Sequence, residues 1–239
     1  MPPSVAFVFA MPMELAPLAR TLSLEKRSAG GQARWFGQLG RRPVVAIVTG
    51  MGTALATAGV ERLLAETEVD RVVVVGITGA IHEETPIGTL IRPSVVIDGA
   101  TGTEYRPEPL GLVAPDGVMW TSDSLITDPD TLARLRGDGV VSLDMETAAV
   151  AAVCVGRGIP WTVIRAISDR ATDGSVDEEV FRLSNQDGTP NAKAVAAFVL
   201  RHPGRLPAMA RMAKGARLAT ERSVEAAVAA VSGLDDGPD

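Results

Sequence analysis

Short apolar runs rich in valine and isoleucine alternate along this chain with longer stretches of helical character, and this alternation constrains the fold most strongly. The runs are continuously apolar, which is typical of strands that are covered on both faces of a sheet. Strand followed by helix, repeated, predicts an α/β fold. The predicted strands are residues 5–9, 44–48, 72–75, 94–97, 140–143 and 161–164, and the predicted helices are residues 54–66, 145–157, 191–200 and about 205–231.

The length of 239 residues suits one large α/β domain, so we expect residues 1–239 to form a single domain, with extended C-terminal helices from about residue 190. Apolar residues make up 46% of the sequence, which is enough to build the core of such a domain. Segments 98–116 and 185–190 are rich in turn-forming residues, and we expect them to be mobile or to cover a substrate. Residues 234–239 are expected to form a frayed tail.

Several classes of function are disfavoured by composition. A single cysteine, Cys154, cannot form an intramolecular disulfide, and the histidines His82 and His202 lie far apart, so no metal site is expected. The net charge of −6 argues against a nucleic-acid partner, because phosphate contacts require a positive surface. The locally basic stretch 201–222 is interpreted as a solvated helix face.

The sequence also lacks the features of a membrane protein. No apolar run approaches the roughly 20 residues that a membrane-spanning helix requires. The first residues lack the basic region, longer apolar core and small-residue cleavage site of a signal peptide. We therefore expect no membrane span and a cytoplasmic location.

Four segments carry polar residues or glycines directly after predicted strands, where open α/β sheets bind their ligands. Glu14 lies one turn into the helix expected after the first strand, where an acid alone would be interpreted as stabilising the helix dipole. Segments 49–53 and 75–80 contain glycines that would let a ligand approach the backbone at tight strand-to-helix turns. Neither segment matches the dinucleotide fingerprint, and no GKS or GKT phosphate loop occurs, so NAD and ATP are not expected as cofactors.

The fourth feature is a pair of segments, 144–146 and 165–169, each following a buried strand. Glu146 could accept hydrogen bonds from two neighbouring hydroxyls of a ribose, and Met145 would supply an adaptable apolar surface. Asp169, with a pKa raised by desolvation, could protonate a purine nitrogen as general acid. Glu14 could then polarise a water molecule opposite the leaving base, with the sugar passing through an oxocarbenium-like state.

With those residues assembled, residues 5 to about 173 resemble the methylthioadenosine/S-adenosylhomocysteine nucleosidases of the purine nucleoside phosphorylase-like superfamily. Residues 143–148, Leu-Asp-Met-Glu-Thr-Ala, are similar to that family's ribose motif, and residues 165–169, Arg-Ala-Ile-Ser-Asp, to its catalytic signature. Residues 9–14 resemble its first strand with the glutamate that activates water. The resemblance implies a three-layer sandwich around a central mixed, partly barrel-like sheet, and no cofactor.

The resemblance also implies a role for each matching residue. Asp169 and Glu14 are the implied catalytic residues. Leu125 and Ile126 lie in segment 121–126, where the family places residues that line the base. The implied substrate-binding residues are Glu146, Met145, Ser168, Arg165, Met51, Gly79, Thr78, Leu125 and Ile126.

These assignments predict a hydrolase that cleaves the N-glycosidic bond of an adenine nucleoside such as methylthioadenosine or S-adenosylhomocysteine. Residues 76–80 read Gly-Ile-Thr-Gly-Ala where the family has Gly-Ser-Ala-Gly-Gly, so the serine near the nucleophile is missing unless Thr78 replaces it. Phosphate-dependent cleavage is therefore an alternative. It would require a basic phosphate site, for which Arg165 is the obvious candidate near the motifs.

Two further alternatives remain. Segments 187–190 and 201–208 look like the C-terminal part of hopanoid-associated relatives, so the 5′ group could be larger, as in a futalosine-like or adenosylhopane-like nucleoside. A nucleoside-binding protein without turnover is the other alternative, because a fold does not establish a function. The expected partner is a small purine nucleoside, and the resemblance implies a homodimer or a higher oligomer.

Overall fold

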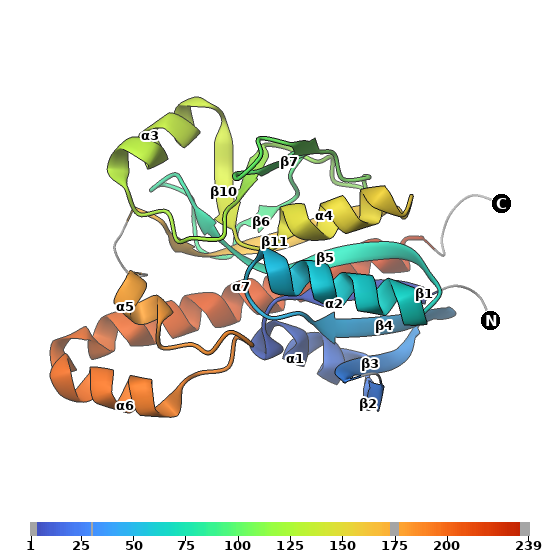
Figure 1. Cartoon of the computed structure of the whole chain (residues 1–239), viewed down its shortest axis with the longest axis horizontal. Coiled ribbons are helices and arrows are strands. Elements are labelled where there is room, and N and C mark those ends of the chain that lie inside the picture. The colour runs from blue at the N-terminus through green and yellow to red at the C-terminus, as the bar shows by residue number, and fades with distance from the viewer. Residues whose placement is uncertain (1–3, 30, 173–176, 235–239) are drawn as a thin grey trace.

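A computed structural model describes residues 4–29, 31–172 and 177–234 of the chain, and Figure 1 shows how its elements are arranged. The strands are β1 (Ser4–Phe9), β2 (Glu25–Ala29), β3 (Gln32–Leu39), β4 (Arg42–Val48), β5 (Val69–Ala80), β6 (Leu90–Ile91), β7 (Val95–Asp98), β8 (Glu104–Tyr105), β9 (Val118–Thr121), β10 (Val140–Asp144) and β11 (Trp161–Arg170). The helices are α1 (Pro12–Thr21), α2 (Thr53–Glu66), α3 (Pro129–Gly137), α4 (Thr147–Gly156), α5 (Glu178–Phe181), α6 (Ala192–Arg201), the short 3-10 helix η1 (Pro203–Arg205) and α7 (Leu206–Ser232).

The described strands form one mixed sheet that branches at β5. Its main path runs β2-β3-β4-β1-β5-β10-β9-β7-β8, while β11 pairs with β5 and with β6 away from this path. The long strand β5 is parallel to β1 and β11 over most of its length, and its last residues pair antiparallel with β10. This branching brings the carboxyl ends of β1, β4, β10 and β11 together around the end of β5.

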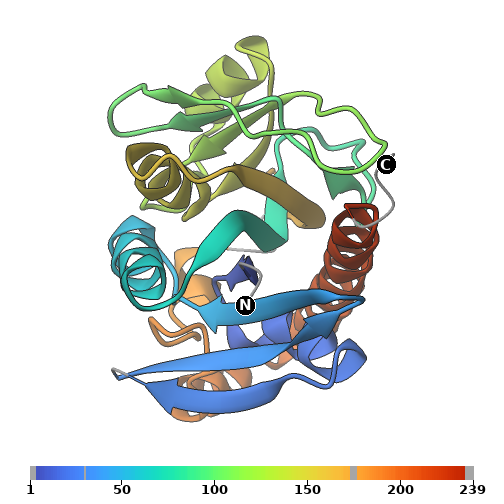
Figure 2. The same ribbon diagram turned by 90° about the vertical axis from the view of Figure 1, so that its right-hand side faces the viewer.

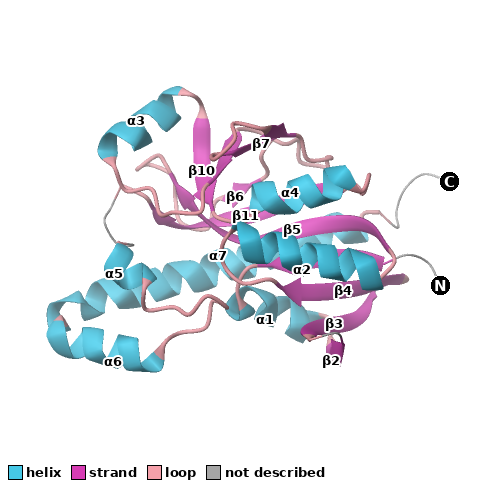
Figure 3. Ribbon diagram, viewed as in Figure 1, coloured by secondary structure: helices cyan, strands magenta, loops and turns pink. Residues whose placement is uncertain are grey.

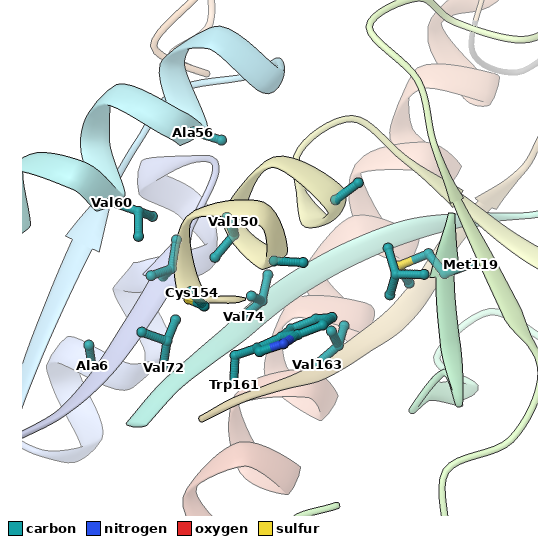
Figure 4. Packing of buried hydrophobic residues seen from close by; sticks show 14 of the residues in the cluster. Ala6, Ala56, Val60, Val72, Val74, Met119, Val150, Cys154, Trp161 and Val163 are labelled. Atoms are coloured by element: carbon teal, nitrogen blue, oxygen red, sulfur yellow. The ribbon is translucent and has the colours of Figure 1, made fainter. Parts of the chain in front are cut away.

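Helices cover both faces of the central strands and give the molecule three layers, which Figure 2 shows edge-on. Consecutive residues of β1, for example Ala6 and Phe7, point to opposite faces of the sheet and belong to two different buried clusters. One cluster packs against α2 and α4, and Figure 4 shows Val72, Val74 and Val163 of the sheet facing these helices. The other packs against α1 and α7. Burial on both faces explains why these strands are continuously apolar.

The predicted α/β fold around a mixed sheet is confirmed, and each predicted strand and helix overlaps an observed one. Several elements were not predicted, namely the β2–β3 hairpin, the strands β6, β8 and β9, and the helices α3 and α5. The hairpin was missed because its strands are partly exposed and carry charged residues between the apolar ones. Segment 98–116, predicted as a loop, contains β8. Within the described ranges, no helix is long and apolar enough to cross a membrane.

One local prediction was wrong in a way that affects the site. Residues 76–80 were expected to form a strand-to-helix turn, but they continue β5 to Ala80. Gly79 pairs with Leu143 of β10 and with Asp169 of β11. The glycines therefore allow close approach inside a sheet rather than at a helix start. Residues 235–239 of the predicted tail lie outside the described residues. The same holds for residues 1–3 at the N-terminus and for residue 173, where the resemblance to the family ends.

Candidate functional site

A cavity of about 380 Å³ lies where the carboxyl ends of the central strands meet. Side chains from β5, β10 and β11 line it on the sheet side, and the start of α1 closes one edge. All eleven residues singled out from the sequence line this cavity: Glu14, Met51, Thr78, Gly79, Leu125, Ile126, Met145, Glu146, Arg165, Ser168 and Asp169. The structure thus brings the predicted set together, although their chemical roles stay predictions.

The Glu14 carboxylate is held rigidly and is fully buried. Its Oε2 accepts hydrogen bonds from the backbone N–H of Ala10 (3.0 Å) and Met11 (2.8 Å), and its Oε1 accepts one from Ile77 N–H (2.8 Å). The bond to Met11 is the helix-start contact that an acid at this position was expected to make. Burial raises the pKa of Glu14, while Arg165 and the three backbone N–H groups oppose that rise.

A glycine on β5 makes room for this carboxylate. A Cβ atom on Gly76 would overlap the Glu14 carboxyl group, which lies directly against the β5 backbone. The positive φ of Gly76, 154°, also disfavours other residues there. The sequence analysis predicted that a ligand would approach the backbone of segment 75–80, but the group that lies against Gly76 is the side chain of Glu14.

A buried arginine organises the floor of the cavity. Arg165 is 2% exposed, and its Nη2 forms an ion pair with Asp144 Oδ2 at 2.6 Å. Its Nη1 donates to Ile77 O (2.8 Å) and its Nε donates to Thr147 Oγ1 (3.1 Å). All three guanidinium nitrogens therefore have partners within the protein.

Asp144 is the fixed partner of Arg165. Its Oδ1 accepts from Thr121 Oγ1 (2.6 Å), and its Oδ2 accepts from the hydroxyl (2.5 Å) and the N–H (2.9 Å) of Thr147. Both oxygens of Asp144 therefore have partners within the protein. The sequence analysis gave a binding role to Glu146 and none to Asp144, and it did not predict these contacts of Asp144.

Glu146, at the start of α4, presents its carboxylate to the cavity beside Arg165. Its Oε1 accepts from Gly52 N–H (2.9 Å), and its Oε2 lies 3.4 Å from Arg165 Nη2. Burial raises the pKa of Glu146 to about 7, with Arg165 opposing the rise and Asp144 and Glu14 adding to it. Burial is the main cause of this raised pKa, and the negative charges of the neighbouring Asp144 and Glu14 add to it.

A bulge in β11 brings two consecutive side chains into the cavity. Ile167 pairs with Thr78 and Asp169 with Gly79, so Ser168 is an extra residue on β11. Consecutive residues of a regular strand point to opposite faces, but here Ser168 and Asp169 both line the cavity. The Ser168 hydroxyl donates a short hydrogen bond to Asp169 Oδ1, and this bond fixes the orientation of the carboxyl group.

Thr78, the residue expected to replace a serine, already uses its donor. Its hydroxyl donates to Leu143 O at 2.7 Å, and its side chain is 3% exposed. The Thr78 oxygen can therefore only accept a hydrogen bond from a molecule in the cavity.

The backbone N–H groups of residues 51–53, at the turn that leads into α2, have partners within the protein. Gly52 N–H bonds Glu146, and Thr53 N–H bonds Asp123 Oδ1 at 2.8 Å. Met51 N–H donates to Gln186 O at 2.9 Å, which ties this turn to the predicted covering segment 185–190. Carboxylates of the protein thus occupy the positions that an external anion would need.

An apolar wall of the cavity was missed by sequence reasoning. It is built by the chain from α5 to α7, and its members are Val180, Phe181, Leu183, Val195, Met209, Met212 and Ala216. The predicted covering role of segment 185–190 is consistent with this placement, since Pro190 also lines the cavity. Met209 and Met212 lie three residues apart on α7, a spacing that places both on one helix face but does not show what that face contacts.

The cavity holds four acidic residues, Glu14, Asp144, Glu146 and Asp169, and Arg165 is the single lysine or arginine among its described lining residues. No group of three or more histidine, cysteine, aspartate or glutamate residues suited to a metal ion occurs in the described part of the chain. The arrangement offers fixed carboxylates for proton transfer and diol binding at an acidic surface.

Comparison with known proteins defines the class of this chain. The family model described as the phosphorylase superfamily matches residues 4–111 and 107–201, and the chain belongs to this superfamily. A 5′-methylthioadenosine/S-adenosylhomocysteine nucleosidase from Chromohalobacter salexigens is 28% identical over 228 residues, which is 82% of this chain and 97% of the relative.

Solved structures show the same fold. The 5′-methylthioadenosine/S-adenosylhomocysteine nucleosidase of S. pneumoniae, solved with a transition-state inhibitor, aligns with a TM-score of 0.74 at 19% identity, covering 97% of this chain and all of that one. A futalosine hydrolase of Helicobacter pylori aligns with a TM-score of 0.72 at 15% identity, covering 98% of each chain. The predicted resemblance to this family is confirmed, and the chain is an enzyme of the nucleosidase and phosphorylase type by its family.

Proposed function

We propose that this protein is a nucleosidase that uses water to cleave the N-glycosidic bond of an adenine nucleoside carrying a 5′ thioether, such as methylthioadenosine or S-adenosylhomocysteine. The observation that carries the proposal is the charge of the cavity, in which four carboxyl groups accompany one guanidinium whose nitrogens are all paired. A phosphate dianion would meet four carboxyl groups and no available cation. A water molecule is uncharged, so these carboxyl groups do not repel it.

The proposed reaction follows from the positions of three carboxyl groups. Glu146 accepts hydrogen bonds from the two ribose hydroxyls, and Asp169, oriented by Ser168, donates a proton to a ring nitrogen of the leaving base. Glu14 orients a water molecule on the opposite face of the sugar and accepts a proton from it. Its raised pKa makes it a better base near neutral pH than an ordinary glutamate.

The carboxyl groups that disfavour phosphate as the nucleophile would also stabilise the transition state. The sugar becomes positively charged as the base departs, and carboxylates already fixed by backbone N–H groups stabilise that charge without reorganising. Burial makes the ionised forms of Glu14 and Glu146 costly and so raises their pKa values. A cationic sugar forming beside them would offset part of that cost. Leu125 and Ile126 are assigned to the apolar faces of the base.

The test is to incubate the protein with methylthioadenosine, S-adenosylhomocysteine, adenosine and inosine, with and without phosphate, and to identify the products. Free base and free sugar in phosphate-free buffer support the proposal. Sugar 1-phosphate formed only when phosphate is added would make the protein a phosphorylase and would remove the role given to Glu14. An Asp169→Asn variant that binds nucleoside as well as the wild type, with neither protein showing turnover, would indicate a binding protein.

The apolar wall from α5 to α7 favours a second candidate, a nucleoside with a larger apolar 5′ group. Each methylene buried against that wall would improve binding roughly fourfold. We therefore expect KM to fall along a series of 5′-alkylthioadenosines of increasing chain length. A constant or rising KM would favour the methylthio group. The expected homodimer or higher oligomer stays a prediction, which light scattering would test.

A further inference from the structure

The hairpin formed by α6, η1 and α7 carries a concentration of positive charge that the proposed reaction does not use. Figure 3 shows α6 and the start of α7 at the end of the molecule opposite both termini, while the rest of α7 runs back across the molecule toward the C-terminus. Between residues 191 and 220 the sequence contains no acidic residue, although the whole chain has a net charge of −6. Its basic residues there are Lys193, Arg201, Arg205, Arg211, Lys214 and Arg217.

Most of this charge is available for an outside partner. Arg205 pairs with Asp177 (2.8 Å) and Arg217 with Glu221 (3.0 Å). The remaining four, which are Lys193, Arg201, Arg211 and Lys214, are exposed and form no ion pair with an acidic side chain among the described residues.

Two exposed leucines flank the connection between the helices. Leu200 is 83% exposed at the end of α6, and Leu206 is 46% exposed at the start of α7. The hairpin has an apolar interior in which Phe198 packs with Val180 and Leu183, yet both leucines lie outside it. Large exposed leucines among cations are typical of surfaces that insert into the interface of a bilayer.

We propose that this hairpin docks on the surface of an anionic lipid membrane, with the four cations at the lipid headgroups and the two leucines inserted between them. Clusters of four to eight basic residues attract anionic lipids. A nucleic acid would also attract the cations, but it offers no apolar interior for Leu200 and Leu206, so the membrane accounts for both features. A surface-bound protein of this kind needs no membrane-spanning helix.

Docking would also place the apolar wall of the cavity near the bilayer, because Met209 and Met212 follow Leu206 on α7. An apolar nucleoside could then pass from the lipid to the cavity. This consequence rests on the proposed function with a large 5′ group, whereas the docking itself does not.

The test is co-sedimentation of the full chain with phosphatidylcholine vesicles that contain either no phosphatidylglycerol or about one third of it. We expect binding to the anionic vesicles alone, weakening at least tenfold between 0.1 and 0.5 M salt because the contact is between exposed charges. The quadruple variant Lys193→Glu, Arg201→Glu, Arg211→Glu and Lys214→Glu should lose binding at least tenfold. The matched control, Arg20→Glu, Arg41→Glu, Arg62→Glu and Arg157→Glu, carries the same net charge and should retain it.

The leucines are tested separately. Leu200→Ser with Leu206→Ser should weaken vesicle binding at least fivefold, while Leu112→Ser with Val155→Ser, also at exposed positions, should not. Unfolding curves establish that each variant folds.

Absence of binding to anionic vesicles, equal loss in the control, or full binding by the double serine variant would each overturn the proposal. So would preferential binding to DNA in a gel-shift assay, or a hairpin variant that changed only the oligomeric state. None of these readouts depends on turnover, so the proposed reaction can fail independently.

Discussion

Gly76 and Glu14 share one space, because the Glu14 carboxyl group lies where a Cβ atom on residue 76 would be. A Gly76→Ala variant must therefore displace the carboxylate from Ile77 N–H, to which it now bonds at 2.8 Å. If Glu14 positions the nucleophile, kcat should fall by about 10²-fold, the lower end of the effect of a general base. Steady-state kinetics with the best substrate would measure the loss.

The control for this variant is Gly156→Ala. Gly156 lies in α4 with open space around its Cα, so a methyl group there meets no other atom. Its kcat should match the wild type. Full activity of Gly76→Ala would show that the position of Glu14 is unimportant for the reaction.

Ser168 should act as a positioning residue for Asp169. Removing its hydroxyl in Ser168→Ala deletes the hydrogen bond to Asp169 Oδ1 but leaves the bulge and the acid in place. We expect kcat to fall about tenfold with little change in KM, and Asp169→Asn to lower kcat by about 10² to 10⁴-fold. A Ser168→Thr variant, which retains the hydroxyl, should recover most of the loss. If serine, alanine and threonine give equal kcat values, Ser168 does not orient the acid.

The sequence predicted the composition of the cavity well because its polar residues follow buried strands. Strand ends in such sheets converge, so Glu14, Glu146, Arg165 and Asp169 were expected near one another. Two features were not predictable. The bulge at Ser168 depends on how β11 pairs with β5, and nothing in Arg-Ala-Ile-Ser-Asp reports that pairing. The second is the set of contacts that holds Asp144, because its bonds to Arg165 and Thr121 depend on how three different strands pack.

The apolar wall was missed for a related reason. Met209, Met212 and Val195 lie on helices whose apolar residues the sequence reveals, but periodicity gives no information about the partner of an apolar face. Those faces contact the cavity because the chain after β11 returns over the site through α5 and α6. A turn-rich segment between strand and helix, residues 185–190, was the sequence signal that pointed to this return.

Affinity for the ribose diol should depend on pH through Glu146. The pKa of this carboxyl is about 7, so it is ionised above pH 7 and protonated below it. An ionised carboxylate accepts both hydroxyl hydrogens, whereas a protonated one has a donor in place of an acceptor. The Kd for methylthioadenosine should therefore be lowest near pH 8 and should rise by up to about tenfold for each pH unit below 7. Calorimetry with the Asp169→Asn variant would measure Kd without turnover.

Two controls separate this effect from other titrations. A 2′,3′-dideoxy analogue lacks the hydroxyls and should bind weakly with a flat pH profile. Glu146→Gln should abolish the dependence while leaving the fold intact. A diol and a dideoxy ligand with parallel profiles would assign the titration to another group.

Arg165 should be more important for stability than any exposed arginine, since it neutralises a buried cluster of three carboxyl groups. Arg165→Met would leave Asp144, Glu146 and Glu14 without their shared cation, and breaking a buried pair in this way costs about 3–5 kcal/mol. Arg217→Met removes an ion pair between side chains that are 79% and 47% exposed, and such pairs are worth about 0–1 kcal/mol. Urea unfolding at pH 8, where Glu146 is ionised, should resolve this difference. At pH 5.5 the loss from Arg165→Met should shrink, because Glu146, whose pKa is raised to about 7, then takes up a proton and needs less compensation. Equal free energies of unfolding for the two variants at pH 8 would contradict the role given to Arg165.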